Sequence, residues 1–127
     1  MRSMITDDLL FEHRSRALNP DNPFIRGTAQ NPDVYFQGRE TVNNFYTATP
    51  GIVHAAMQEF AQHTGRKYEL YQYYGAADAD RVMIIMGSGG ETAAETAAAL
   101  NTAGEKTGVL LIRLYRPFDM DYFIKAL

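Results

Sequence analysis

A glycine-rich turn comes nearest to a chemical site in this sequence. Residues 86–91 read MGSGGE, between a short apolar run and an alanine-rich stretch typical of a helix. A strand that enters a helix through glycines presents free backbone N–H groups, and the positive end of the helix dipole, to an anion. The candidates for binding a phosphate or carboxylate at this turn are Gly87, Ser88, Gly89 and Gly90.

The same turn also has a purely structural interpretation. The pattern is not G-x-G-x-x-G, because Thr92 occupies the last glycine position, and no Lys-Ser or Lys-Thr pair follows. Glu91 places a negative charge where a phosphate would sit. Ser88 and Glu91 have the spacing of a capping box, in which side chains satisfy the first N–H groups of the helix.

No other residues form a catalytic or metal-binding pattern. His54 and His63 fall on roughly opposite sides of one expected helix, so they cannot bind one metal ion. No histidine pairs with an acid in a spacing such as H-E-x-x-H. The sequence has no cysteine, which excludes disulfides, thiol catalysis and thiolate-held iron–sulfur clusters. We therefore assign no catalytic residue, no bound cofactor and no metal ligand to this chain.

Composition narrows the class of protein further. The chain has 127 residues, of which 46% are hydrophobic and 21% charged, as in one globular domain. A net charge of −3 gives no basic surface for nucleic acid. No apolar run approaches the length of about 18 residues typical of a membrane span. The N-terminus is charged and does not resemble a signal peptide, so we expect a cytoplasmic protein.

Hydrophobic periodicity predicts an α/β fold, with three α/β/α layers and a small, mostly parallel sheet. The apolar run 81–87 suits a strand covered on both faces. We expect residues 1–40 to form an N-terminal helix and an extended irregular arm, and 41–127 the α/β/α domain, in a single domain overall. Along the chain we expect a helix over 5–17 and an irregular stretch over 19–40. A helix then begins at 41, and a new helix begins at Pro50 with Thr49 as its N-cap. The elements expected after it are strands over 67–75, 81–87 and 109–117, a helix over 91–103, and a final helix after Pro117.

The arm contains a segment, 26–40, that is dense in amide and guanidinium groups. Such groups make directional hydrogen bonds, and the stretch is too long for a plain connector. It is either a contact surface for another part of a protein or a solvated loop. The candidate contact residues are Arg26, Thr28, Gln30, Asn31, Tyr35, Gln37 and Arg39.

Three long blocks of the sequence resemble homodimeric pyruvate:ferredoxin (flavodoxin) oxidoreductases. They are RGTAQNPDVYFQGRE (26–40) with the NNFY and ATPGIV that follow, YGAADADRVMIIMGSGGETAAET (74–96) and GEKTGVLLIRLYRPFD (104–119). The resemblance extends in order from Leu9 onward. The chain has GSGGE where the family often shows GSGAE or GSS, which leaves the turn intact.

The resemblance implies the second core domain of a long multidomain enzyme, similar in fold to the transketolase C-terminal domain. It implies that the parent converts pyruvate and coenzyme A to acetyl-CoA, using thiamine diphosphate, magnesium and iron–sulfur clusters, and passes electrons to ferredoxin or flavodoxin. The family's cofactor residues belong to flanking domains, so this piece is expected to contact other domains and the homodimer mate, and to be inactive alone. The alternatives are the same role in another 2-oxoacid:ferredoxin oxidoreductase, or a stand-alone small-anion or nucleotide-binding module that uses residues 87–91.

Overall fold

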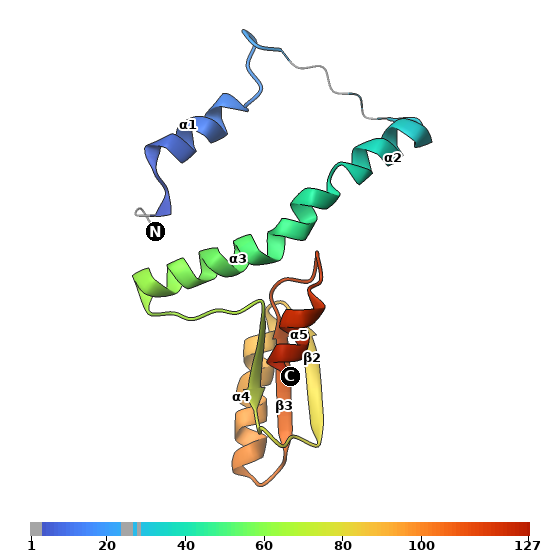
Figure 1. Ribbon diagram of the computed structural model, residues 1–127. Coiled ribbons are helices and arrows are strands. Elements are labelled where there is room, and N and C mark those ends of the chain that lie inside the picture. The colour runs from blue at the N-terminus through green and yellow to red at the C-terminus, as the bar shows by residue number, and fades with distance from the viewer. Residues whose placement is uncertain (1–3, 24–26, 28) are drawn as a thin grey trace. The chain divides into compact units, whose positions relative to one another are not determined.

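The computed structural model describes residues 4–23, 27 and 29–127, which form two compact units, Met1–Asn44 and Phe45–Leu127 (Figure 1). The first unit contains helices α1 (Asp7–Ser15) and α2 (Pro32–Glu40), and neither helix has a buried residue. Thr6 is the N-cap of α1, and its hydroxyl oxygen accepts a hydrogen bond from the Leu9 N–H at 3.3 Å.

Helix α2 corrects the expectation of an irregular chain through residue 40. Asn31 is extended and occupies the N-cap position, and Pro32 begins the helix. Proline is favoured there because its missing N–H would lack a helical partner in any case, and its fixed φ suits the first turn. The Asn31-Pro32 step therefore marks the start of a helix inside the stretch for which we expected irregular structure.

Helix α3 (Asn43–Thr64) continues through Pro50, so the expectation of a new helix at that proline is wrong. Thr49 does not cap a helix. Its hydroxyl donates to the Phe45 carbonyl at 2.7 Å, which satisfies an acceptor in the preceding turn, and Pro50 is buried. Although α3 has 22 residues, no helix in the described part of the chain is long and apolar enough to cross a membrane.

The sheet has three strands, β1 (Tyr71–Gly75), β2 (Arg81–Met86) and β3 (Thr107–Ile112), in the order β1-β3-β2. Helix α4 (Gly89–Thr102) joins β2 to β3, which are parallel, so the expected β-α-β unit is confirmed. Strands β1 and β3 are antiparallel, which makes the sheet mixed where we expected a mostly parallel one. The short link between β1 and β2 explains this, because parallel strands need a crossover of a dozen or more residues.

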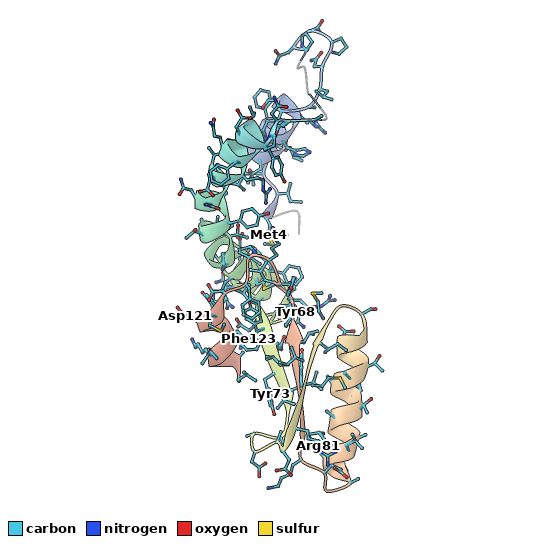
Figure 2. All side chains as sticks on the ribbon, turned by 90° about the vertical axis from the view of Figure 1, so that its right-hand side faces the viewer. Met4, Tyr68, Tyr73, Arg81, Asp121 and Phe123 are labelled. Carbon is cyan, nitrogen blue, oxygen red and sulfur yellow. The ribbon has the colours of Figure 1, made fainter. Side chains whose placement is uncertain are left out.

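Helices cover both faces of the sheet, which confirms the α/β class. Figure 2 shows α4 and the helix that carries Asp121 and Phe123, α5 (Met120–Ala126), on opposite sides of the strands. Helix α4 packs on the face that carries Leu111. The opposite face holds a core of Leu70, Tyr71 and Leu110, against which α3 and α5 pack through Val53, Met57, Tyr122, Phe123 and Ala126.

The burial of β2 differs from the sequence-based expectation. We expected a strand covered on both faces, but most of its side chains are exposed, including Ile84 at 54%. In the central strand β3, by contrast, Leu110 is completely buried. The reason is position, since β2 lies at an edge of the sheet and has a neighbouring strand on one side only among the described residues. The apolar residues of β2 are therefore mostly exposed, although their sequence predicts burial on both faces of the sheet.

Candidate functional site

The glycine-rich turn connects β2 to α4 at the carboxyl end of the parallel strands. Gly87 has a φ of 89°, a backbone conformation that favours glycine, and the Gly90 N–H donates to its carbonyl at 3.1 Å. Ser88 is the N-cap residue but has helical backbone angles and makes no side-chain capping bond. The expected capping box with Glu91 is therefore not formed, because Ser88 lacks the extended conformation from which a cap hydroxyl reaches the helix N–H groups.

Gly89 and Gly90 of this turn have packing roles. A Cβ atom added to Gly89 would lie 3.3 Å from Cδ1 of Ile85, on the preceding strand. A Cβ added to Gly90 would lie within 3.3 Å of Cδ1, Cγ and Cδ2 of Leu111, on the central strand. Such distances are shorter than the 3.5–4.0 Å at which carbon atoms pack best. Glycine therefore allows the first turn of α4 to lie close against the sheet.

A shallow pocket beside the turn contains charges of both signs. Its lining includes the Glu91 carboxylate and Arg113, the cation that an anion would seek. The guanidinium of Arg113 already donates to the Gln72 side-chain oxygen at 2.6 Å and lies 5.0 Å from the centre of the Tyr68 ring. The interpretation of residues 87–90 as an anion site stays a prediction, and the Glu91 carboxylate places a negative charge in the same pocket.

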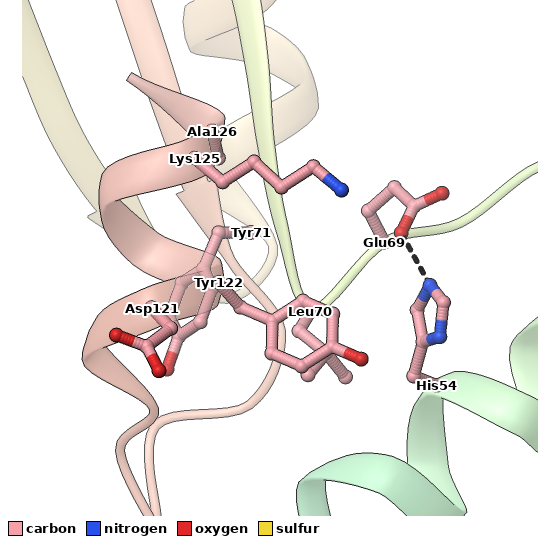
Figure 3. A pocket seen from close by; sticks show the side chains of 8 residues that line it. All are labelled: His54, Glu69, Leu70, Tyr71, Asp121, Tyr122, Lys125 and Ala126. Atoms are coloured by element: carbon pink, nitrogen blue, oxygen red, sulfur yellow. Dashed lines mark hydrogen bonds and ion pairs between the residues drawn. The ribbon is translucent and has the colours of Figure 1, made fainter.

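A second pocket, which sequence reasoning missed, lies between α3, the start of β1 and α5 (Figure 3). Nε2 of His54 lies 3.1 Å from Oε2 of Glu69, and the Gln58 amide donates to Oε1 of the same carboxylate at 3.2 Å. The His54 ring centre is 5.1 Å from that of Tyr122. These contacts tie α3 to the segment that leads into the sheet and to α5.

The chemistry available in this second pocket is limited. It also has a carboxylate, Asp121, and an ammonium group, Lys125, so charges of both signs are present. The lining residues include no serine, threonine or cysteine, so the histidine has no hydroxyl or thiol nucleophile of these types to activate. No sequence pattern could have found the pocket, since His54 and Glu69 lie on different elements and only the fold brings them together.

The described residues contain no set of side chains that suits a metal ion or a cluster. The sequence has no cysteine for an iron–sulfur cluster. In the described ranges 4–23, 27 and 29–127, no group of three or more His, Asp or Glu residues could hold a metal ion. The residues thus do not fit the clusters and magnesium that the resemblance implies for the parent, and no reaction step is assigned through those groups here.

The predicted contact residues of the arm divide into three sets. Arg26 and Thr28 lie outside the described residues. Gln30 and Asn31 precede α2 and are exposed, and the Asn31 side chain makes no capping bond with the helix. The other three lie on α2 itself. The role of these residues in contacts stays a prediction.

Helix α2 separates its candidate residues onto two sides. Tyr35 and Arg39 are one turn apart and share a side, together with Phe36, which sequence reasoning had not singled out. Gln37 lies on the opposite side. Tyr35 and Phe36 are 56% and 65% exposed, so two large aromatic side chains face solvent on the side of α2 that also carries Arg39.

Comparison with known proteins gives relatives that match the chain from end to end. The "Pyruvate-flavodoxin oxidoreductase" of a Nostoc species is 57% identical over 127 residues, and that of Rhodospirillum rubrum is 54% identical over 127 residues. The "Pyruvate:ferredoxin oxidoreductase" of Moorella thermoacetica is 50% identical over 127 residues. In each case the match covers 100% of this chain but only 11% of the relative. No protein-family model matches the chain.

The matches extend over the whole chain, so the resemblance does not depend on any single motif. The relatives are oxidoreductases whose names couple pyruvate to flavodoxin or ferredoxin. The chain spans about a tenth of their length. Over its whole length, this chain is homologous to one segment of the pyruvate-flavodoxin and pyruvate:ferredoxin oxidoreductases.

Proposed function

We propose that this chain is one domain of a pyruvate:ferredoxin (flavodoxin) oxidoreductase, which oxidatively decarboxylates pyruvate to acetyl-CoA in the cytoplasm. The observation that carries this proposal is identity of 50–57% over the entire chain to several enzymes of that name. The matched segment covers 11% of each of these relatives, which supports the role of one domain within a longer enzyme. The division at 40/41 into an arm and an α/β/α body is part of the same proposal.

The role of this domain is to make contacts rather than to perform catalysis. Thiamine diphosphate, magnesium, coenzyme A and the iron–sulfur clusters are held by other parts of the parent, and its electrons pass to ferredoxin or flavodoxin. The residue types present support this, since the chain has no cysteine and the lining of the pocket that holds His54 has no serine, threonine or cysteine. Its partners are the remaining domains and the homodimer mate.

The α2 surface formed by Tyr35, Phe36 and Arg39 is the proposed contact face of the arm. Aromatic residues and arginine are enriched in the buried centres of protein interfaces, where they carry much of the binding energy. The first unit has no buried residue in either of its helices, so it gains little from packing on itself. Gln30 and Asn31 lie just before this face and can add directional hydrogen bonds to the same partner.

An activity assay tests the catalytic part of the proposal. The full-length parent should reduce flavodoxin or ferredoxin when supplied with pyruvate and coenzyme A, and the 127-residue chain alone should not reduce a viologen dye. Parallel reactions with 2-oxobutyrate and 2-oxoglutarate distinguish a related substrate. Turnover by the 127-residue chain would overturn the contact role, and a parent that prefers another 2-oxoacid would correct the substrate.

Alanine substitutions in the full-length enzyme test the contact face. Tyr35→Ala and Arg39→Ala should each weaken domain or subunit association by at least about 1 kcal/mol, or roughly fivefold, because they truncate anchor side chains. Gln37→Ala, on the other side of α2, is the matched control. Sedimentation and thermal unfolding measure the effect. If all three variants associate as the unaltered enzyme does, this face makes no contact.

A further inference from the structure

Arg113 follows β3 directly and is a cation partly withdrawn from solvent. Among the lysines and arginines in the part of the chain that the structure describes, it is the only one that is not exposed. Its backbone N–H donates to the Leu70 carbonyl at 2.9 Å, which fixes the residue beside the start of β1. Arginines that are withdrawn from water are usually paired, because a charge loses solvation when it is buried. The contacts of the guanidinium group therefore show whether its charge is balanced.

Neutral groups hold the guanidinium in place. It donates to Oε1 of Gln72 at 2.6 Å and to the Tyr74 hydroxyl at 3.4 Å, and its central carbon lies 5.0 Å from the centre of the Tyr68 ring. An amide, a hydroxyl and an aromatic ring orient the cation, but none of them carries a negative charge. No carboxylate among the described residues lies at ion-pair distance from Arg113. The side chain is thus positioned for a partner whose charge the described residues do not supply.

The pocket that Arg113 lines lies at the carboxyl ends of β2 and β3, beside the first turn of α4. Groups that bind to open α/β sheets are commonly found outside this end of the strands. The Glu91 carboxylate lies in the same pocket and disfavours a multiply charged group such as phosphate. A single carboxylate suits the guanidinium, whose five N–H donors form a planar fork that matches carboxylate geometry. The charges of the pocket therefore favour one carboxylate as the missing partner.

We propose that Arg113 forms an ion pair with an Asp or Glu side chain that belongs to the full-length protein and lies outside these 127 residues. This inference rests on the proposed function, because the relatives extend far beyond the matched 11% of their length. The pair attaches another part of the enzyme to the end of the sheet. Because Gln72 and Tyr68 already hold the guanidinium, it loses little side-chain entropy when the acid binds.

Carbodiimide coupling identifies the acid. Arg113→Lys in the full-length parent places an amine at this position, and a carbodiimide joins that amine to a contacting carboxylate as an amide, taking up the elements of water to become a urea. The link between Lys106 and Asp78, whose charged groups are 2.6 Å apart, is the internal control. The expected product joins position 113 to one acid outside the 127 residues, mapped by mass spectrometry. A link to Glu91, or no link at position 113 when the control link forms, overturns the proposal.

A double-mutant cycle then tests the pairing with the native arginine. The acid is replaced by its amide, with and without Arg113→Gln, and the rate of irreversible thermal unfolding of the parent is measured. Each single change should speed unfolding, and the effect of Arg113→Gln should be at least roughly fivefold smaller when the acid is already an amide. The contacts with Gln72 and Tyr68 are lost in both backgrounds and cancel in the cycle. Effects that simply multiply show that the two groups do not interact, which overturns the proposal.

Titration of the 127-residue chain distinguishes a free anion from a protein side chain. Acetate or inorganic phosphate is added while the Arg113 Nε–H signal is followed by NMR, with the exposed Arg116 as the reference. We expect no saturation below roughly 10 mM, because a single ion pair in contact with water binds weakly. Saturation below that concentration, abolished by Arg113→Gln, assigns the site to a free anion and overturns the proposal. Pyruvate oxidation by the unsubstituted parent is a separate readout, so an inactive parent that gives the link refutes the enzyme assignment alone.

Discussion

Replacing Gly90 with alanine tests whether the glycine-rich turn is shaped by packing. The added Cβ would lie within 3.3 Å of three carbon atoms of Leu111, whose side chain is only 5% exposed and has little room to move. Overpacking of this kind costs about 1–3 kcal/mol. Alanine recovers up to about 1 kcal/mol of helix propensity. We therefore expect Gly90→Ala to lower the free energy of unfolding by roughly 0–2 kcal/mol.

Gly51→Ala is the matched control, because Gly51 also lies in a helix and no atom lies within 4 Å of its added Cβ. This variant should raise the free energy of unfolding by about 0.5–1 kcal/mol, because alanine allows the unfolded chain fewer conformations than glycine does. The stability difference between the two variants, about 1–3 kcal/mol, isolates the contact with Leu111. Urea unfolding of the 127-residue chain, followed by circular dichroism, gives both values.

A second substitution makes the measurement specific to the contact. Leu111→Val removes the outermost carbons of the crowded side chain, so it should recover part of the loss caused by Gly90→Ala. The double-mutant cycle reports this coupling directly. If Gly90→Ala is as stabilising as Gly51→Ala, the close approach of α4 to the sheet does not determine the residue at position 90, and the packing explanation of the turn is refuted.

Three further substitutions are expected to lower stability in the same urea assay. Gly75→Ala should cost about 2 kcal/mol or more, because φ is 117° and the new Cβ would meet the Thr107 backbone; a neutral result would contradict that geometry. Asn101→Ala should cost about 1–3 kcal/mol, since the Asn101 amide bonds the Thr107 N–H at 2.8 Å and carbonyl at 2.9 Å; Asn101→Asp, which keeps the acceptor, should cost less. Asp119→Ala should cost about 0.5–2 kcal/mol through loss of the cap on the Tyr122 N–H, and Asp119→Asn should restore most of it.

Local sequence patterns were sufficient to predict the β-α-β unit. The apolar runs at 81–87 and 109–117, separated by an alanine-rich helix that Gly104 ends, predicted β2, α4 and β3, although β3 ends at Ile112 and residues 113–117 lie outside it. These elements could be predicted because their periodicity and end signals lie within a few residues of one another. The resemblance to the oxidoreductases could also be recognised from contiguous residues.

The prolines were harder to interpret. Pro32 and Pro50 both suggest a break when only neighbouring residues are considered. Pro32 instead begins α2, and Pro50 lies inside α3 and is buried. Burial is a tertiary property, and it can offset the loss of one helical hydrogen bond that a proline imposes. The sequence alone does not contain the information that decides between these outcomes.

The contacts at the candidate sites depend on long-range packing. The pairing of His54 with Glu69 joins a helix to a segment before the sheet, and the fit of Gly90 to Leu111 joins the start of α4 to the central strand. The exposure of β2 likewise depends on strand order, which places it at an edge. An apolar run in a sequence predicts a strand but does not indicate which neighbours that strand will have.

The strand order β1-β3-β2 has a consequence for biosynthesis. Strands β1 and β2 are consecutive in the chain but are not neighbours in the sheet, and among the residues that the structure describes both pair only with β3. As the polypeptide leaves the ribosome, β1 and β2 emerge first, and neither has a partner until Thr107–Ile112 follows. Non-local pairing of this kind slows folding and leaves apolar segments open to aggregation. The nascent chain therefore holds two unpaired strands, one rich in tyrosine and one in methionine and isoleucine, until its central strand has been synthesised.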